Sequence, residues 1–504
     1  MKVFEIVIAL LLGGAVLAAI ARRLAMPYPA LVAIAGAALA LLPGAPRIML
    51  DPELALTLFV APVLLDAAFD ASQRDLRENW RAVVSLALGA VVLTVLVVAV
   101  VAHALVPGLP WVAAITLGAI VAPPDAAAAT TVLKQLRPPN RLLVVLEGES
   151  LFNDASALLI YRFAVGASVT GLASGWSFAG MLITISIGSI ALALVLSRII
   201  LFIVSRIEDF ATSVIFQFCS AFAVWMLAEN LHLSGILTVV ILAMLLSRPA
   251  PTTMGARMRV SSYAVWEVAV FVLNVLAFIL VGLQLRQIVE RTTWTEYVGV
   301  AAAVCVAVIL ARMLWVSAAA AVSRTVELSG RAAWVVGWCG MRGTVTLAAA
   351  LALPRDFPYR DLIFFTSFAV VLVTLVVQGM TLRPLLKWLA IRDDDTIERE
   401  VHLARVETLR AALEATKACG VSETAELLRR RYEWRLRRAE THSGEHDHDS
   451  ELKDAEVVRV AAAAERRRLI ELRDNGTIGD TAFQRIEQEL DMREIELIAI
   501  ELEA

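Results

Sequence analysis

Charged residues are scarce in this chain of 504 residues. Asp, Glu, Lys and Arg together make up 18% of it, hydrophobic residues make up 59%, and the mean hydropathy is +0.73. A typical soluble domain is about 25% charged, so this composition excludes a chain that is soluble throughout. A spanning helix needs about 20 mostly apolar residues, and the first three quarters of the chain carry such runs one after another. We therefore expect an all-α polytopic membrane protein.

Metal and disulfide motifs are missing as well. The four cysteines have neither CxxC nor metal-ligand spacing, and the apolar runs contain no HExxH motif and no paired histidines. We interpret the cysteines as small apolar residues packed between helices and not as metal ligands or disulfide partners, because unpaired cysteine is readily buried. An enzyme in the membrane would need a nucleophile with a base, or a metal cluster, near mid-depth. The sequence predicts no enzyme, no resident cofactor and no nucleic-acid partner.

Charge divides the chain into two regions. Residues 1–392 hold 27 Lys and Arg against 20 Asp and Glu, whereas residues 393–504 hold 18 against 28. The second region combines dense charge with apolar residues at helical spacing, which is typical of helices in water. We predict a transmembrane domain over 1–392 and a helical cytoplasmic tail over 393–504.

The apolar runs predict about 13 transmembrane helices. Of the 27 Lys and Arg residues in the first region, 18 fall in the loops that are cytoplasmic if the N-terminus lies outside. Because cytoplasmic loops carry an excess of Lys and Arg, we expect the protein in the cell membrane with its N-terminus on the outer side and its C-terminus in the cytoplasm. The predicted spans begin near residues 3, 28, 53, 82, 111, 142, 177, 210, 234, 262, 296, 332 and 361.

The sixth predicted span carries polar residues in the stretch LEGESLFNDAS. Ser150 and Asp154 are four residues apart and share one helix face, and Glu149 and Asn153 share the adjacent face. Charged groups at membrane depth are costly, and they usually face a bundle interior or a wet cavity. We expect this stripe to face a cavity, with Glu147 on another side of the helix, near the interface.

Asp154 has no obvious basic partner in the sequence. A carboxylate without a counter-charge in a low-dielectric cavity can exchange a proton for a cation near neutral pH. We interpret Asp154 as the functional acid, with Asn153 available to orient it. Ser150 has two open interpretations, a contact to the ion or a hydrogen bond to its own helix backbone.

Two predicted spans are interrupted. In the fifth, Pro123 and Pro124 remove backbone donors, so the helix must break, and Asp125 follows as a cap of the second half or as an ion ligand. In the twelfth, Arg342 stands between Gly340 and Gly343. Interrupted helices at corresponding positions are typical of transporters built from inverted repeats, which bind ions near the midplane. Arg342 could hold the C-terminal ends of the half-helices through their carbonyls, or act in transport directly.

Two further charges lie within predicted spans. Arg312 in the eleventh span needs a carboxylate partner, and Glu149 is the natural one, which favours a structural ion pair. Asp66 in the third span follows a kink at Pro62, where it is either an ion contact or an interfacial residue.

Four motifs carry a resemblance to a known family. PPDA in the fifth span, ESLFND in the sixth, ARMLW in the eleventh and GMRG in the twelfth occur in order. They resemble the monovalent cation/proton antiporters of the sodium/proton exchanger family, of the NhaP/NHE type, over about residues 5–390. The resemblance implies a homodimer that works by alternating access, with a moving core that carries these four spans.

The resemblance also implies roles for individual residues. Asp154 matches the exchanging carboxylate, Asn153 marks the electroneutral class, and Glu149 pairs with Arg312. Asp125, Ser150 and Asp66 match positions that contact the ion, so that Asp154 and Asp125 are the expected carboxylate ligands of the transported metal ion. The family commonly has Thr-Asp-Pro in the interrupted stretch, where this chain has Pro124-Asp125-Ala126. A threonine hydroxyl is therefore lacking, but the carbonyl of Pro124 remains as a ligand.

We predict an antiporter that exchanges a monovalent cation, Na⁺ first and K⁺ or Li⁺ as alternatives, for H⁺ in cation and pH homeostasis. Carboxylate and carbonyl oxygens suit all three cations, so the sequence does not choose among them. A passive cation channel is the rival function, and interrupted helices with a titratable carboxylate favour exchange over it.

Overall fold

The computed structural model describes residues 2–24, 27–42, 52–133, 138–170, 175–283, 294–322, 330–354, 356–391, 396–418, 423–441 and 463–472, and isolated positions up to residue 490. The chain separates into two compact units, Met1–Asp394 and Asp395–Ala504. The boundary falls two residues from the predicted one. All regular structure in the described ranges is helical, as the fold prediction requires.

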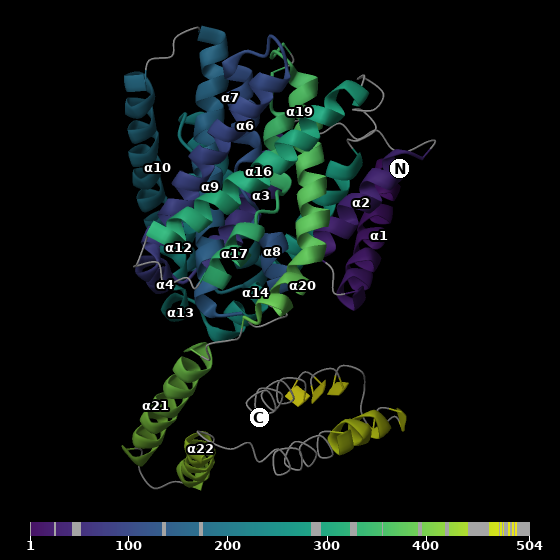
Figure 1. Cartoon of the computed structure of the whole chain (residues 1–504). Coiled ribbons are helices and arrows are strands. Elements are labelled where there is room, and N and C mark those ends of the chain that lie inside the picture. The colour runs from purple at the N-terminus through teal and green to yellow at the C-terminus, as the bar shows by residue number, and fades with distance from the viewer. Residues whose placement is uncertain are drawn as a thin grey trace. The chain divides into compact units, whose positions relative to one another are not determined.

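The first unit is a bundle of apolar helices, with α10 at one edge and α1 and α2 at the opposite edge (Figure 1). Helices begin close to all thirteen predicted starts. Among the described helices, seven are long and apolar enough to cross a membrane by length and composition, so the count of thirteen stays a prediction. The continuous helices of the bundle are α1 Lys2–Leu24, α2 Tyr28–Ala40, α3 Pro52–Asp70, α9 Asn140–Thr170, α10 Gly175–Val204, α11 Phe210–Asn230, α12 Gly235–Ser247, α14 Ala256–Leu283 and α16 Trp294–Val322.

Two membrane segments contain a turn of π-helix. The helices α5 Trp80–Val84 and α6 Val91–Leu105 flank η1 Ser85–Ala90, and α19 Arg360–Val373 and α20 Gly379–Leu389 flank η3 Thr374–Gln378. Single π-turns inside α-helices frequently occur at functional sites. The second one contributes Thr374 to the site described below. The short helices α4 Gln73–Glu78 and α13 Ala250–Thr253 complete the connections.

Two further crossings are made by pairs of short helices. The first pair is α7 Trp111–Val121 and α8 Ala126–Leu133, and the second is α17 Gly330–Trp338 and α18 Thr344–Leu351. Each member has 11 residues or fewer, which is too short to cross about 30 Å of hydrocarbon alone. The breaks fall at the predicted Pro and Gly positions.

Small residues let some helices approach to backbone contact. A Cβ on Gly36 of α2 would lie 2.6 Å from the carbonyl oxygen of Ile279, and one on Gly282 of α14 would lie 2.5 Å from the nitrogen of Ala37. Close packing through small residues is a main source of helix association in lipid. The close contacts at Gly36 and Gly282 hold α2 against α14.

Helix α9 lies between the two largest apolar clusters. Its Leu146 and Ala157 are buried in one cluster with α6, α7 and α17, and its Leu151 and Ala155 are buried in the other with α3, α11 and α12. The polar stripe of the sixth predicted span is on this helix. The site is therefore surrounded by packed helices.

The second unit contains a helical hairpin. α21 Thr396–Ala418 and α22 Glu423–Thr441 pack through Val406, Leu409 and Ala439. An ion pair of 2.7 Å between Arg410 and Glu440 joins the two helices. The helical prediction for this region holds for these described residues.

Candidate functional site

The two interrupted segments meet at their breaks. Residues 122–125 connect α7 to α8, and residues 339–343 connect α17 to α18. The backbone N–H of Asp125 donates a hydrogen bond of 2.7 Å to the carbonyl oxygen of Met341. Non-helical backbone at membrane depth is tolerated where protein or a water-filled cavity surrounds it. A backbone donor of the first break is thus satisfied by a backbone acceptor of the second.

Arg342 is 1% exposed and lies at this crossing. Its Nε donates to the carbonyl oxygen of Val121 at 2.6 Å, its Nη1 donates to the carbonyl oxygen of Gly340, and its backbone N–H donates to Oγ1 of Thr374 at 3.0 Å. The last carbonyls of a helix carry negative partial charge and lack partners inside the helix. The guanidinium therefore connects the C-terminal end of α7 to the stretch just after α17, and whether Arg342 also acts in transport stays a prediction.

A buried ion pair connects α9 to α16. Nη1 of Arg312 donates to Oε1 of Glu149, and its Nη2 donates to Oε2 at 2.8 Å. Arg312 also donates to the carbonyl oxygen of Val336 in α17, at 3.0 and 3.2 Å. Both side chains of the pair are 2% exposed. Glu149 is thus the carboxylate that the sequence suggested for Arg312, and both its oxygens are engaged.

Two side chains of α9 bind the broken stretch between α7 and α8. Nδ2 of Asn153 donates to the carbonyl oxygen of Pro124 at 2.9 Å. Oγ of Ser150 accepts from the backbone N–H of Ala126, the first residue of α8, at 3.3 Å. Ser150 therefore satisfies a donor of the neighbouring half-helix. Together these bonds fix the position of Asp125, which lies between the two residues they hold.

A cavity of about 320 Å³ lies beside the crossing. Its walls come from α3, α8, α9, α14, α18 and both breaks. The predicted site residues that line it are Asp66, Asp125, Ser150 and Asp154. Asp66 and Asp154, 88 positions apart in the chain, thus share one cavity, whereas Glu149, Arg312 and Arg342 do not line it.

Asp154 lines this cavity and is 7% exposed. Within the described part of the chain, its carboxylate forms no ion pair and no hydrogen bond. The carboxylate of Asp125 acts on it electrostatically, and the two negative charges repel each other. A small cation or a proton placed between two such carboxylates relieves both the burial of charge and the repulsion.

Two acidic residues of the cavity were not predicted to line it. Glu147 was expected on another side of α9, yet it faces the same space as Ser150 and Asp154. The spacing i, i+3 and i+7 does place these three on one face, so the signal was present. Asp70, the last residue of α3 and one turn after Asp66, also lines the cavity.

Among the described residues, no group of three or more His, Cys, Asp or Glu side chains could hold a metal ion. The predicted metal ligands Asp154 and Asp125 line one cavity but do not belong to such a group. Pro124, predicted as a carbonyl ligand, has its carbonyl oxygen bonded to Asn153.

Comparisons with known proteins agree on one family. A family model described as "Sodium/hydrogen exchanger, transmembrane" matches residues 6–388. An uncharacterized Na(+)/H(+) exchanger of Mycobacterium tuberculosis is 30% identical, over 98% of this chain and 96% of its own length. A sodium, potassium, lithium and rubidium/H(+) antiporter of Bacillus pumilus is 29% identical, over 77% of this chain and 63% of its own.

A solved structure shares the fold. The sodium proton antiporter MjNhaP1 of Methanocaldococcus jannaschii, solved at pH 8, superposes with a TM-score of 0.62 and 20% identity. The match covers 77% of this chain and 99% of that one. The first unit therefore has the fold of that antiporter.

Proposed function

Because the chain belongs to the sodium/hydrogen exchanger family, it is a secondary transporter that exchanges a monovalent cation for protons, and we propose that Asp154 is the group at which the two ions compete. The observation that carries this proposal is a carboxylate that lines a cavity at the crossing of two broken helices and that no described residue neutralises. A group that can hold a proton or a cation, never both, couples the two fluxes.

The cation site that we propose consists of Asp154, Asp125, Ser150 and Asp66, with the carbonyl of Pro124 as a further oxygen. In support, the three carboxylates and the hydroxyl line one cavity. Glu147 and Asp70 lie in the same cavity toward the ends of α9 and α3. We propose that these two acids attract cations at the entrance.

Orientation and organisation are also proposals. We propose that residues 1–392 form the transmembrane antiporter domain of a homodimer in the cell membrane, with the N-terminus outside. Residues 393–504 are then a cytoplasmic tail. The excess of Lys and Arg in alternate loops supports this orientation, and Asp70 at the cavity is then near the cytoplasmic side. The cavity opens inward in this arrangement.

Sodium is the cation that we propose first. The name of the Bacillus pumilus relative includes potassium, lithium and rubidium, so potassium is the second candidate. The test uses purified protein in liposomes with a fluorescent pH indicator, to which each chloride salt is added over a pH series. Dequenching that saturates with sodium and depends on the pH gradient supports exchange, whereas a flux that is linear in concentration and needs no gradient would indicate a channel.

Exchange should be insensitive to the membrane potential. If each Asp154 carboxylate carries one cation in one direction and one proton in the other, no net charge moves in a cycle. We expect equal initial rates in proteoliposomes held at zero and at about −100 mV with potassium and valinomycin, with sodium as the transported ion. Because a moving elementary charge would gain about 2.3 kcal/mol at 100 mV, a voltage-dependent rate would contradict one-for-one exchange.

Gly343 is expected to be essential because of its contact with Asp125. A Cβ at this position would lie 1.7 Å from Oδ2 of Asp125 and 2.6 Å from its Cβ. Rotation of the carboxylate alone cannot relieve this overlap, so Gly343→Ala must displace Asp125. A misplacement of about 1 Å costs roughly 100-fold in enzyme sites, and we expect a comparable loss of exchange rate.

The matched control for Gly343→Ala is Gly166→Ala in α9, where a Cβ meets no atom within 4 Å. Both variants are compared for yield, melting temperature and exchange rate. A Gly343→Ala protein with the exchange rate of the control would show that the position of Asp125 is unimportant.

A further inference from the structure

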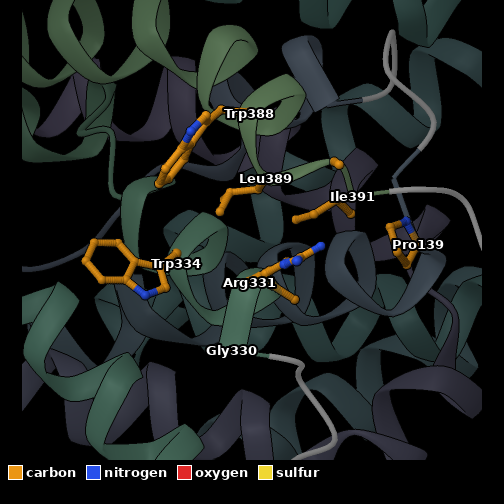
Figure 2. Close-up of a pocket in the computed structure, with 9 residues that line it drawn as sticks. Pro139, Gly330, Arg331, Trp334, Trp388, Leu389 and Ile391 are labelled. Atoms are coloured by element: carbon orange, nitrogen blue, oxygen red, sulfur yellow. The ribbon is translucent and has the colours of Figure 1, made fainter.

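A second cavity, of about 840 Å³, lies away from the ion site. It is formed where three elements end: α17 begins at Gly330, α20 ends at Leu389, and Pro139 directly precedes α9. In the proposed orientation these ends lie at the cytoplasmic surface of the membrane. Its lining includes Pro139, Arg331, Trp334, Trp388, Leu389 and Ile391 (Figure 2).

Two exposed tryptophans indicate at which level of the membrane this cavity lies. Trp388 is 79% exposed and Trp334 is 55% exposed. Tryptophan is enriched at the level of the lipid headgroups, because its ring is apolar and its N–H is polar. Trp388 lies two residues before Ala390, which ends α20 in the left-handed conformation with a φ of 47°. The cavity therefore lies where headgroups meet acyl chains.

Arg331 supplies the charge of the cavity. It is the one charged side chain among the described residues that line it. Within the described ranges it forms no ion pair and no hydrogen bond to another residue. Figure 2 shows its guanidinium extending between Pro139 and Ile391, with the two tryptophans on the other side of Leu389. A positive group thus lies at one end of the cavity and an apolar surface at the other.

We propose that this cavity binds an anionic phospholipid of the cytoplasmic leaflet. The phosphate pairs with the guanidinium of Arg331, since arginine and phosphate form two parallel charge-assisted hydrogen bonds. The acyl chains lie along Leu389 and the faces of Trp334 and Trp388. Basic pockets between membrane helices on the cytoplasmic side have this chemistry. A soluble phosphate compound would leave the apolar part of the cavity uncovered.

Such a lipid would connect three elements of the ion site. α9 carries Asp154, α17 leads to the break at residues 339–343, and α20 follows the π-turn that contains Thr374. Because Thr374 accepts from the backbone N–H of Arg342, the elements around the cavity also contact one another at the crossing. Exchange is therefore expected to depend on anionic lipid in the membrane.

The test measures lipid binding to the full-length protein in detergent, so its result does not depend on transport. Phosphatidylglycerol or phosphatidylcholine with identical chains is titrated, and the melting temperature is recorded. We expect a larger, saturable rise with phosphatidylglycerol. Arg331→Gln should lose this difference and Arg331→Lys should keep most of it. Arg206→Gln is the control, because Arg206 is an exposed arginine two residues after the end of α10 that stacks on Phe202.

Three results would overturn the proposal. The first is an equal rise with both lipids in the unmodified protein, and the second is a phosphatidylglycerol effect that survives Arg331→Gln. The third is an equal rise with glycerol 3-phosphate, which has the phosphate without acyl chains and would indicate a site for a soluble anion. Loss of the effect in Arg331→Gln alone, with Arg206→Gln unchanged, supports the lipid site.

Discussion

Asp154→Asn is expected to abolish cation/proton exchange and to leave the protein folded. Asparagine has the size of aspartate, but it can neither release a proton nor neutralise a cation. Asp154 is 7% exposed and no described residue pairs with it, so no partner is left behind by the change. Removing a buried charge also removes its desolvation cost. We therefore expect the melting temperature to stay the same or rise.

The measurement is sodium-driven proton flux in liposomes, with empty liposomes as background. Asp361→Asn is the control, because Asp361 is an exposed residue in the first turn of α19 and lies outside the cavity. Flux at the background level in Asp154→Asn, with near-normal flux in the control, is the expected pair of results. Cation-dependent proton flux above background in Asp154→Asn would mean that another group exchanges the ions.

Breaking the Glu149–Arg312 pair is expected to have the largest effect on stability. Glu149→Gln leaves the guanidinium of Arg312 buried without its carboxylate, and removing one partner of a buried pair costs about 3–5 kcal/mol. The remaining hydrogen bonds to Val336 do not supply a negative charge. We expect a large fall in melting temperature and in the yield of monodisperse protein.

The double variant Glu149→Leu with Arg312→Met separates the cost of an unpaired charge from the value of the pair. Replacing both members of a buried pair by apolar residues is often neutral, so most of the lost stability should return. Arg162→Gln is the matched control on the same helix, because the Arg162–Glu229 pair is 39% and 31% exposed. An exposed pair contributes about 0–1 kcal/mol. Equal stability of Glu149→Gln and Arg162→Gln would contradict the account.

The sequence predicts the breaks and the buried pair because their causes are local or chemically specific. Pro123 and Pro124 cannot donate hydrogen bonds, so α7 had to end before them. A buried arginine needs a carboxylate, and few carboxylates occur in the apolar runs, so Glu149 could be assigned to Arg312. These inferences need no knowledge of how the helices are arranged.

Other features depend on tertiary packing and could not be read from the sequence. The spacing puts Glu147 on the face of Ser150 and Asp154, but Glu147 and Asp70 lie near helix ends, where a charged residue is ordinarily solvated, so the sequence does not show that they line a cavity. Only the packing of α3 against α9 and α14 decides that both face the cavity. Trp334 and Trp388 are 54 positions apart in the chain and come together at one cavity only in the fold. Helical periodicity gives the face of a residue, but its depth and neighbours come from the assembled bundle.

The central claim is that a proton and a cation exclude each other at Asp154. It is tested most directly by counting protons released when sodium binds to the purified protein in a weakly buffered solution. We predict saturable release that approaches one proton per bound cation at acidic pH. The apparent affinity should weaken about tenfold for each unit of decrease in pH in that range. Sodium binding without proton release, or release that persists in Asp154→Asn, would contradict the claim.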